Sequence, residues 1–316
     1  MDTEQRKLLY KLAIAYYEDG LTQKQIGKRF GVSRIKVSRL LQQARQQKIV
    51  NIHITPVDDA NIDLERVLCQ KYGLDEVIAV PVKNGQVVDF YHELGVAAAD
   101  TLQRSLQNKE VIAITWGRTL KAVVNNLPVM TKPEIRVVQA LGGINSPDVE
   151  INGSELARKL AQIIGARPIL LSSPGLVASR DIRDALVKDP QISRVIELAA
   201  KADIALVGVG ALNHESLARR YNIISRDDFE RLKARDVIGD IGLRYFNSQG
   251  EQVDDELHDR TIGLDLNQLR KVKRVIGVTG GPDKVESIRA ALKGKLINVL
   301  ITDDNTGKAL LENSTA

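Results

Sequence analysis

The sequence predicts an α/β protein in which a small all-α helix-turn-helix domain precedes a doubly wound α/β domain. Three observations support this fold class. The chain of 316 residues is longer than one typical domain. Its first part combines helical periodicity with two capping patterns, and from about Ile62 helix-length stretches alternate with short apolar runs. We expect the helix-turn-helix domain at 1–56 and the α/β domain at 57–316.

Composition limits the class of protein. Apolar residues make up 43% and charged residues 27% of the chain, as in globular proteins, and no run approaches the roughly 18 apolar residues of a membrane span. The first residues, MDTEQRKLL, include acids and lack the apolar run of a secretory signal. We therefore expect a cytoplasmic protein without a membrane partner.

Cysteine and histidine give no indication of a metal or a cofactor. The one cysteine, Cys69, excludes an internal disulfide and a multi-thiolate metal site, and its place in LERVLCQ predicts a core residue. The four histidines have no metal-ligand spacing. We expect neither a metal site nor a cofactor.

Positive charge is concentrated near the N-terminus. Residues 1–54 hold 11 Lys and Arg but only 4 Asp and Glu, whereas the rest of the chain holds 34 basic and 36 acidic residues. No acidic residue occurs between Leu21 and Lys48. This asymmetry predicts a polyanionic partner for the first domain and none for the second.

The basic segment has the pattern of two short helices joined by a turn. Thr22 and Gln25 form a capping box for the first helix. Gly31 supplies the turn, and Ser33 can cap the second helix. Upstream apolar residues at helical spacing can form a supporting helix: Leu8, Leu9, Leu12, Ala13, Tyr16 and Tyr17. Together these features have helix-turn-helix spacing.

The second helix has an inward and an outward face. The inward face carries Val37, Leu40, Leu41 and Ala44 at helical spacing. We expect DNA contacts from the outward face and from the start of the first helix, through Gln23, Lys24, Ser33, Arg34, Ile35, Lys36, Ser38, Arg39 and Gln42.

Each side chain type on this outward face suits a duplex. Arg39 and Gln42 can pair with base edges, Ile35 can contact a thymine methyl, and flanking bases such as Arg45 can reach phosphates. The alternative is a solvated basic helix in a bundle. Agreement among capping, turn glycine, core spacing and charge favours the DNA-binding interpretation. A short strand is expected next, at Ile49–Ile54, where apolar and polar residues alternate.

Seven apolar runs predict the strands of the large domain. The runs are too uniformly apolar for half-exposed strands, which indicates a mostly parallel sheet covered on both faces. They are Val77–Val80, Val111–Thr115, Ile135–Ala140, Pro168–Leu171, Ile204–Val209, Val275–Thr279 and Asn298–Thr302.

Ligands bind beyond the carboxyl ends of the strands in such sheets. Trp116–Thr119 brings backbone N–H groups, a hydroxyl and a guanidinium to the start of a helix, which suits an anion. The pairs Gly142–Gly143 and Gly280–Gly281 follow two other runs, and Lys284 can bind a phosphate or a hydroxyl. Any one of these glycine pairs can also be a simple turn. Three such loops in one domain favour a small anionic ligand.

Two further loops leave alternatives open. Gly208–Asn213 contains part of a dinucleotide-binding fingerprint but lacks its third glycine, so NAD binding is not expected. Asp240 lies between Gly239 and Gly242 in apolar surroundings. Its carboxylate can accept hydrogen bonds from sugar hydroxyls, or it can close a turn.

Several stretches match a known family in order and spacing. They are YYEDGLTQKQIGKRFGVSRIKVSRLLQQAR, WGRT, VVQALGG, VGVGAL, IGDI, and TGGPDKVESIRAAL followed by LINVLITD. Over nearly its whole length the chain resembles the SorC/DeoR-type family of bacterial sugar-responsive transcriptional regulators. The resemblance implies that the first domain binds operator DNA. It also implies that the second domain has a fold like that of sugar-phosphate isomerases and CoA transferases, and senses a phosphorylated sugar without turnover.

The resemblance further implies specific effector-binding residues: Gly117, Arg118, Thr119, Gln139, Gly142, Gly143, Asp240 and Lys284. Some family members have a lysine just before the glycine pair that corresponds to Gly142–Gly143, where this chain has Leu141. Imine formation with an aldehyde is therefore excluded at that position. Family members assemble through their second domains as dimers or tetramers, which implies a homo-oligomer and a palindromic operator.

Two enzyme hypotheses stand as alternatives to a regulator without catalytic residues. A sugar-phosphate isomerase or lactonase with a DNA-binding appendage would need acid–base groups, but no histidine and no obvious pair of carboxylates falls in the candidate loops. A resolvase-like enzyme would need a second domain that acts on DNA, and its slight excess of acids disfavours this.

Overall fold

The computed structural model describes residues 3–51, 61–81, 87–144 and 148–312. The chain forms two compact units, Met1–Asp59 and Ala60–Ala316, and each is described by itself. The expected domain boundary at residue 56 and the expected strand residues 52–54 lie outside the described residues. Ile49–Asn51 do not form a strand, because the N–H groups of Ile49 and Val50 both bond to the Ala44 carbonyl and close the preceding helix. The strand prediction is wrong for these three residues.

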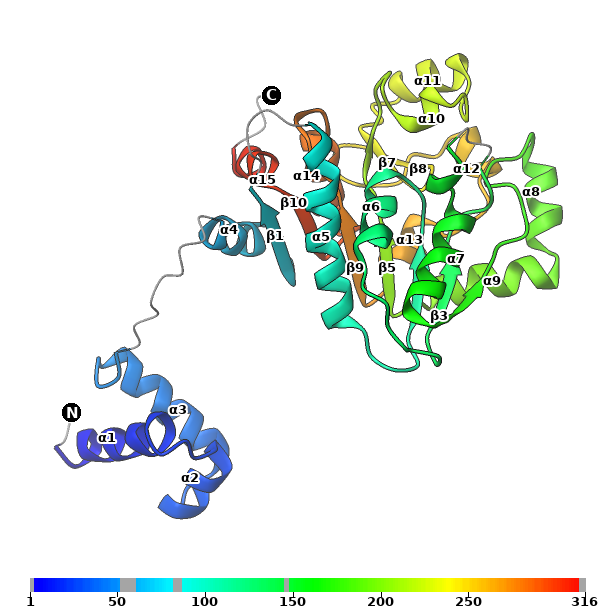
Figure 1. The fold of residues 1–316 in the computed structure, drawn as a ribbon. Helices are drawn as coiled ribbons and strands as arrows, with labels where there is room; N and C mark the ends of the chain where they lie inside the picture. Colours follow the sequence, from blue (N-terminus) through cyan, green and yellow to red (C-terminus); the bar gives the residue numbers. More distant parts are fainter. Residues whose placement is uncertain (1–2, 52–60, 82–86, 145–147, 313–316) are drawn as a thin grey trace. The chain divides into compact units, whose positions relative to one another are not determined.

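The first unit is a three-helix domain (Figure 1) made of α1 (Thr3–Tyr17), α2 (Gln23–Phe30) and α3 (Arg34–Gln46). Thr22 forms the predicted capping box with Gln25. Gly31 ends α2 in the left-handed conformation, and the Ser33 side chain accepts a hydrogen bond from the Lys36 N–H at the start of α3. The three helices enclose a small core: Leu12, Ala15, Ile26, Val37 and Leu41.

The second unit is built on a seven-stranded sheet in which every pair of neighbours is parallel. The strand order is β1-β10-β9-β5-β2-β3-β4. The strands are β1 (Glu76–Val80), β2 (Val111–Ile114), β3 (Arg136–Gln139), β4 (Arg167–Ile169), β5 (Ile204–Val207), β9 (Arg274–Val278) and β10 (Val299–Asp303). Each predicted apolar run overlaps one of these strands, with ends that differ by one or two residues, so the predicted parallel sheet is confirmed.

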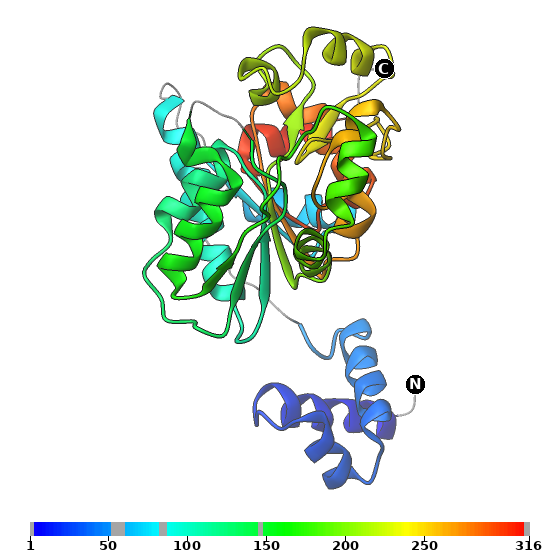
Figure 2. The same ribbon diagram turned by 90° about the vertical axis from the view of Figure 1, so that its right-hand side faces the viewer.

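Helices cover both faces of this sheet (Figures 1 and 2). One face packs against α5 (Val87–Ser105), α6 (Arg118–Asn126) and α7 (Gly153–Ile164). The other packs against α4 (Ile62–Tyr72), α9 (Pro190–Ala200), α13 (Leu266–Leu269), α14 (Val285–Lys293) and α15 (Asp304–Leu311).

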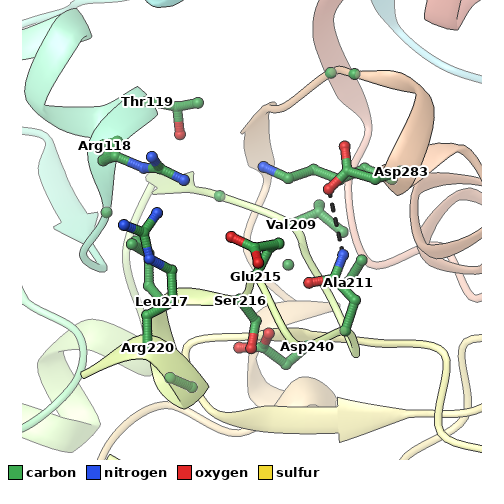
Figure 3. A pocket seen from close by; sticks show the side chains of 18 of the residues that line it. Arg118, Thr119, Val209, Ala211, Glu215, Ser216, Leu217, Arg220, Asp240 and Asp283 are labelled. Atoms are coloured by element: carbon green, nitrogen blue, oxygen red, sulfur yellow. Dashed lines mark hydrogen bonds between the residues drawn. The ribbon is translucent and has the colours of Figure 1, made fainter. Parts of the chain in front are cut away.

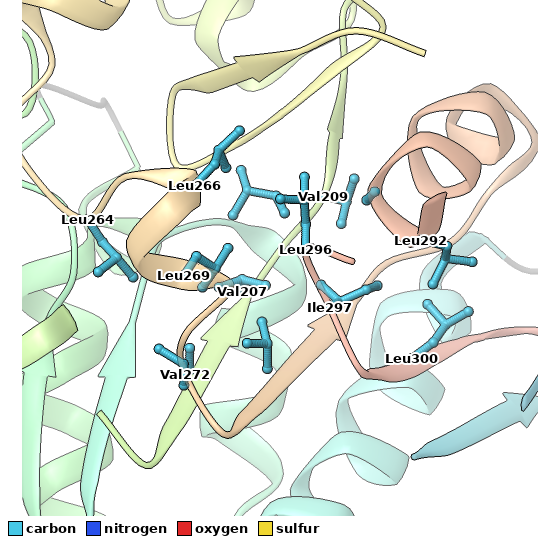
Figure 4. Packing of buried hydrophobic residues seen from close by; sticks show 14 of the residues in the cluster. Val207, Val209, Leu264, Leu266, Leu269, Val272, Leu292, Leu296, Ile297 and Leu300 are labelled. Atoms are coloured by element: carbon cyan, nitrogen blue, oxygen red, sulfur yellow. The ribbon is translucent and has the colours of Figure 1, made fainter. Parts of the chain in front are cut away.

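Successive strand residues alternate between the two cores, as the pleat of a strand requires. Ile112 and Ile114 face α5–α7, whereas Val111 and Ala113 face the opposite side. Figure 4 shows part of the second core, where α13 and α14 pack on the central strands. Cys69 packs against this core half-buried, as its position in the sequence predicts. Within the described residues no helix is both long and apolar enough to cross a bilayer.

A small antiparallel sheet lies beside the main one and was not predicted from the sequence. It is made of β6 (Gly210–Ala211), β7 (Gly239–Ile241) and β8 (Arg244–Phe246). The connecting segments form short helices: α8 (Arg180–Val187), α10 (Leu217–Arg220), α11 (Arg226–Lys233) and α12 (Glu256–Arg260), with 3-10 turns at Val149–Ile151 and Pro282–Lys284. A separate hydrophobic cluster joins the small sheet to α10–α12.

Arg244 ties the small sheet to the loop that follows α12. Its side chain is buried and donates hydrogen bonds to the carbonyl oxygens of His258, Thr261, Gly263 and Leu264 at 2.9–3.2 Å. Among the described residues it forms no ion pair, and burial lowers the pKa of Arg244 to about 10. The guanidinium is therefore still charged at neutral pH, and carbonyl dipoles stabilise it.

Replacing Arg244 by methionine should destabilise the second unit, because Arg244→Met removes these bonds and leaves buried carbonyls without donors. We expect a loss of roughly 2–4 kcal/mol in the free energy of unfolding. Urea unfolding followed by the fluorescence of Trp116, the only tryptophan of the chain, reports on this unit. Arg136→Met, at an exposed position that starts β3, is the matched control and should change stability by less than about 0.5 kcal/mol. Equal unfolding midpoints for both variants would contradict the stabilising role.

Candidate functional site

A cavity of about 350 Å³ opens at the carboxyl ends of three adjacent strands, β9, β5 and β2. The loops that leave these strands contribute Gly280–Gly281, Gly208–Gly210 and Gly117–Thr119 to its walls. The chain continues from β2 to β3 on one side, whereas β5 lies on the other side of β2, so the strand order reverses here. Such a switch point is where doubly wound sheets bind their ligands.

Other elements close the cavity away from the sheet. The small sheet contributes Asp240, the segment around α10 contributes Glu215 and Arg220, and α5 contributes Phe90 and Tyr91. Figure 3 shows side chains from several of these elements around one space. The cavity is therefore assembled from segments that are far apart in the sequence.

Five of the eight predicted effector-binding residues line this cavity. They are Gly117, Arg118, Thr119, Asp240 and Lys284. Three of these residues follow β2, one lies in the small sheet and one follows β9. The structure thus brings together residues that the sequence could only place at separate strand ends.

The structure does not bring Gln139, Gly142 and Gly143 to the cavity. The Gln139 side chain is buried and hydrogen-bonded to two backbone groups of neighbouring loops. Gly142 lies against the backbone of another loop, since a Cβ on it would be 2.4 Å from the Pro174 carbonyl oxygen. Gly143 exchanges backbone hydrogen bonds with this same loop. These three residues therefore build the loop after β3 and do not line the predicted site.

The amino end of α6 is well suited to an anion. Gly117 is its N-cap with φ 128, a conformation that only glycine adopts readily, and no side chain caps the helix. The first N–H groups of α6 therefore have no acceptor within the helix. The half-buried Arg118 stacks on Tyr91, with its guanidinium carbon 5.2 Å from the ring centroid. Tyr91 thus holds the guanidinium beside the cavity.

Asp240 lies in another wall of the cavity, where its carboxylate packs against the backbone of its strand partner Gly210. A Cβ on Gly210 would lie 2.2 Å from Asp240 Oδ1, so any larger residue there would displace the Asp240 carboxylate. Asp240 Oδ2 accepts a 3.0 Å hydrogen bond from the Leu243 N–H, so this residue closes a turn as well as lining the cavity. Burial raises the pKa of Asp240 to about 6, although this bond and the nearby Lys284 act in the opposite direction.

Three cations line the cavity, and none of them forms an ion pair with another described residue. Burial lowers the pKa of Lys284, while Asp283 next to it favours the charged form. Among the described residues, no carboxylate oxygen lies within 4.0 Å of a side-chain nitrogen of Arg118, Arg220 or Lys284. The described residues also contain no group of His, Cys, Asp and Glu side chains placed to hold a metal ion. The arrangement therefore suits an anionic organic ligand.

Sequence reasoning missed Arg220, Glu215, Phe90 and Tyr91. Arg220 and Glu215 lie on or next to α10, a four-residue helix too short to show periodicity. The one indication in the sequence was that both residues closely follow Gly208–Gly210, a loop at a strand end where ligands were expected. Phe90 and Tyr91 lie near the start of α5, and nothing in their sequence spacing points to a cavity.

The outward face of α3 in the first unit is exposed, as predicted. Ser33, Arg34, Ile35, Lys36, Ser38, Arg39 and Gln42 are exposed, Lys24 is exposed on α2, and Gln23 is half-buried. Ile35 is 68% exposed, which is unusual for a large apolar side chain. Arg45 Nε donates a 2.8 Å hydrogen bond to Tyr17 Oη. Tyr17 was predicted to belong to the core of the three-helix domain, but it lies at the surface, where its hydroxyl accepts this bond.

Comparisons with known proteins identify the family. Residues 59–312 match the family model described as "Putative sugar-binding domain", and residues 4–47 match Sigma-70, region 4. The chain is 33% identical over 314 residues to the deoxyribonucleoside regulator of Bacillus subtilis (strain 168), across 99% of this chain and 100% of that protein. The chain belongs to the SorC/DeoR-type family of sugar-binding transcriptional regulators.

Other members of the SorC/DeoR-type family align over similar lengths. The sorbitol operon regulator of Klebsiella pneumoniae is 29% identical over 97% of this chain and 98% of that protein. The crystal structure of the full-length regulator SorC from this organism matches with a TM-score of 0.75, across 98% of this chain and 100% of that chain. The structure of a DeoR family regulator from Listeria monocytogenes matches with a TM-score of 0.76 and 28% identity. It covers 80% of this chain and 100% of that chain. The predicted family and fold class are confirmed, and the protein is a transcriptional regulator with a DNA-binding and a sugar-binding domain.

Asp240→Asn should stabilise the ligand-free protein at neutral pH. Because folding raises the pKa of this carboxyl from 3.8 to about 6, its ionisation reduces stability increasingly as the pH rises from about 4 to 6. An amide avoids this cost, so we expect a gain of about 1–3 kcal/mol at pH 7.5 that shrinks towards pH 4. Urea unfolding at several pH values, followed by Trp116 fluorescence, measures this gain. The exposed Asp254→Asn is the control, and a pH-independent difference for Asp240→Asn would contradict the assignment.

Proposed function

We propose that this regulator controls a carbohydrate-utilisation operon by binding a phosphorylated sugar in the cavity. The observation that carries the proposal is the set of three cations, Arg118, Arg220 and Lys284, that line the cavity without an ion pair among the described residues. A phosphate group has the charge and the acceptor oxygens that these side chains lack. The names of the relatives, a sorbitol operon regulator and a deoxyribonucleoside regulator, support a ligand of this class.

Each wall of the cavity would bind a different part of such a ligand. Thr119 would offer its backbone N–H group and its hydroxyl to the phosphate at the start of α6, and Arg118 would supply charge-assisted hydrogen bonds. The Gly117 N–H already donates to the Ile151 carbonyl oxygen at 3.1 Å, so Gly117 would contribute only the open space beside its backbone. Asp240 would accept hydrogen bonds from sugar hydroxyls, and Lys284 would donate to the ligand between the two ends. Gln139, Gly142 and Gly143 would act indirectly, through the shape of the neighbouring loop.

The helix-turn-helix domain would bind a palindromic operator as part of a homo-oligomer in the cytoplasm. Two recognition helices on one face of a duplex must lie about 34 Å apart, so assembly through the second domains would set their spacing. A ligand that favours one arrangement of the oligomer would then change operator affinity. A coupling of roughly 1–3 kcal/mol is sufficient. No turnover of the ligand is proposed, and incubation with ribose 5-phosphate should yield no isomer.

Arg118→Met should weaken binding of the phosphorylated sugar by about 10-fold to 100-fold, because it removes a charge-assisted contact worth roughly 1.5–3 kcal/mol. A thermal-shift screen of phosphorylated sugars and polyols identifies the ligand, and calorimetry gives its affinity for both proteins. Arg136→Met changes the same residue type at an exposed position outside the cavity and should bind normally. Unchanged affinity in Arg118→Met would exclude this end of the cavity as the phosphate site.

Arg39→Ala should lower specific operator binding by about 1–3 kcal/mol without changing the affinity for the sugar. Lys36→Ala, in contrast, removes an expected phosphate contact and should weaken binding to all duplexes about equally. Fluorescence anisotropy with operator and scrambled duplexes at several salt concentrations separates the two effects. If Arg39→Ala weakened both duplexes equally, its assignment to base contacts would be wrong.

A further inference from the structure

The loop that carries Lys284 is hydrogen-bonded to the start of α15. Gly280, Gly281 and Lys284 of this loop line the cavity. The Gly281 N–H donates to Asp303 Oδ2 at 3.0 Å and to Thr306 Oγ1 at 2.8 Å, and the Thr306 hydroxyl donates to Asp303 Oδ2 at 2.6 Å. Asp303 and Thr306 are buried and do not line the cavity themselves. These bonds therefore connect the cavity wall to a helix behind it.

Close packing prevents this loop from moving independently of its neighbours. A Cβ on Gly280 would lie 2.4 Å from Asp303 Oδ2 and 3.1 Å from the Phe90 ring. The Ser287 hydroxyl of α14 donates to the Lys284 carbonyl oxygen at 2.9 Å, so the loop is also joined to α14. A close-packed interior transmits small displacements. A displacement of Lys284 is therefore passed on to both helices.

The other end of α15 is hydrogen-bonded to α14 and α4, and α15 packs against both helices (Figure 1). The buried Arg289 of α14 donates to the Leu310 carbonyl oxygen at 2.9 Å and to two neighbouring carbonyl oxygens. From α4, Tyr72 Oη and Lys71 Nζ donate to the same Leu310 oxygen at 2.8 and 3.0 Å. The last carbonyl groups of a helix have no donor within it. The three side chains therefore satisfy the carboxyl end of α15 and tie it to α4.

α4 is also in close contact with the first half of α15. A Cβ on Gly307 would lie 3.1 Å from the Leu64 side chain. At the start of α4, Asn61 Nδ2 donates to the Ala79 carbonyl oxygen of β1 at 2.7 Å, and β1 pairs with β10 as far as Asp303. α4 is the first helix after the DNA-binding domain in the sequence. Its position therefore sets the point at which that domain is attached.

We propose that α15 transmits ligand binding from the cavity to α4, and that the contact of Asp303 and Thr306 with Gly281 is the first step. The ligand would shift the loop at Lys284, α15 would follow this shift, and α4 would follow α15. This inference rests on the proposed function, because it takes the cavity as the ligand site. It adds the residues through which the cavity controls the DNA-binding domain. Thr306 acts in this scheme as a positioning residue that contacts neither the ligand nor DNA.

Thr306→Val in the full-length protein tests the proposal, because it removes the hydroxyl that bonds to Gly281 at little change in size. The probe is the tightest-binding member of a panel that includes sorbitol 6-phosphate, fructose 6-phosphate and ribose 5-phosphate. Fluorescence anisotropy gives the ratio of operator Kd with and without this sugar, which should be about 5-fold to 150-fold in the unmodified protein. In Thr306→Val the ratio should shrink by about threefold or more, while calorimetry shows sugar affinity within about threefold of normal.

Thr261→Val is the matched control. It also removes a buried threonine hydroxyl, but that hydroxyl donates to the Leu257 carbonyl oxygen in α12, so the ratio should not change. Gly307→Ala alters the contact between α15 and α4 instead, and it should change the ratio by about threefold or more even if Thr306→Val folds poorly.

An unchanged ratio in both Thr306→Val and Gly307→Ala would overturn the proposal. Loss of sugar binding in a folded Thr306→Val protein would also overturn it, since Thr306 would then belong to the ligand site. The proposed function fails separately, if no sugar of the panel binds the unmodified protein or if the bound sugar leaves its operator affinity unchanged.

Discussion

The side-by-side pairing of β9, β5 and β2 is the constraint on which the cavity depends. In this register Ile112 lies beside Ile204, and Ala205 lies beside Val275, so the three strands end at the same edge. Their loops then start level with one another and face a common space. A strand shifted by two residues would move its loop by about 6.6 Å along the sheet and away from the other two. The apolar faces that set this register therefore also set the geometry of the ligand site.

The large sheet could be predicted from the sequence because strands buried on both faces consist of continuous apolar residues. The runs around Ile112 and Ile204 can be recognised as strands from this property alone. The helix-turn-helix could be predicted from the capping residues Thr22 and Ser33. The small antiparallel sheet could not be predicted. Its strands have two or three residues each, which is too short for any alternation to be recognised. This small sheet nevertheless carries Asp240, which lines the cavity.

Only those parts of the site that directly follow a predicted strand could be predicted from the sequence. Gly142–Gly143 and Gly280–Gly281 look alike in the sequence, since both follow an apolar run. Gly142–Gly143 follows β3, which is not one of the three strands whose loops line the cavity. The backbone around Pro174 also packs against this pair. Both facts are properties of the folded chain. Arg220 reaches the cavity through α10, whose place is likewise set by tertiary packing.

The carbonyl cage around Arg244 also fixes the chemistry of a neighbouring imidazole. A guanidinium can only donate, so His258 Nδ1, which lies 3.0 Å from Arg244 Nη1, must carry a lone pair. The ring proton then resides on Nε2, which lies 3.2 Å from the Gln252 amide nitrogen. Because two donors do not bond to each other, the amide must turn so that Oε1, which has no partner among the described residues, accepts from the ring. One arginine thereby selects the tautomer of a histidine and the orientation of a glutamine, and it disfavours the doubly protonated ring that would bring two positive charges face to face.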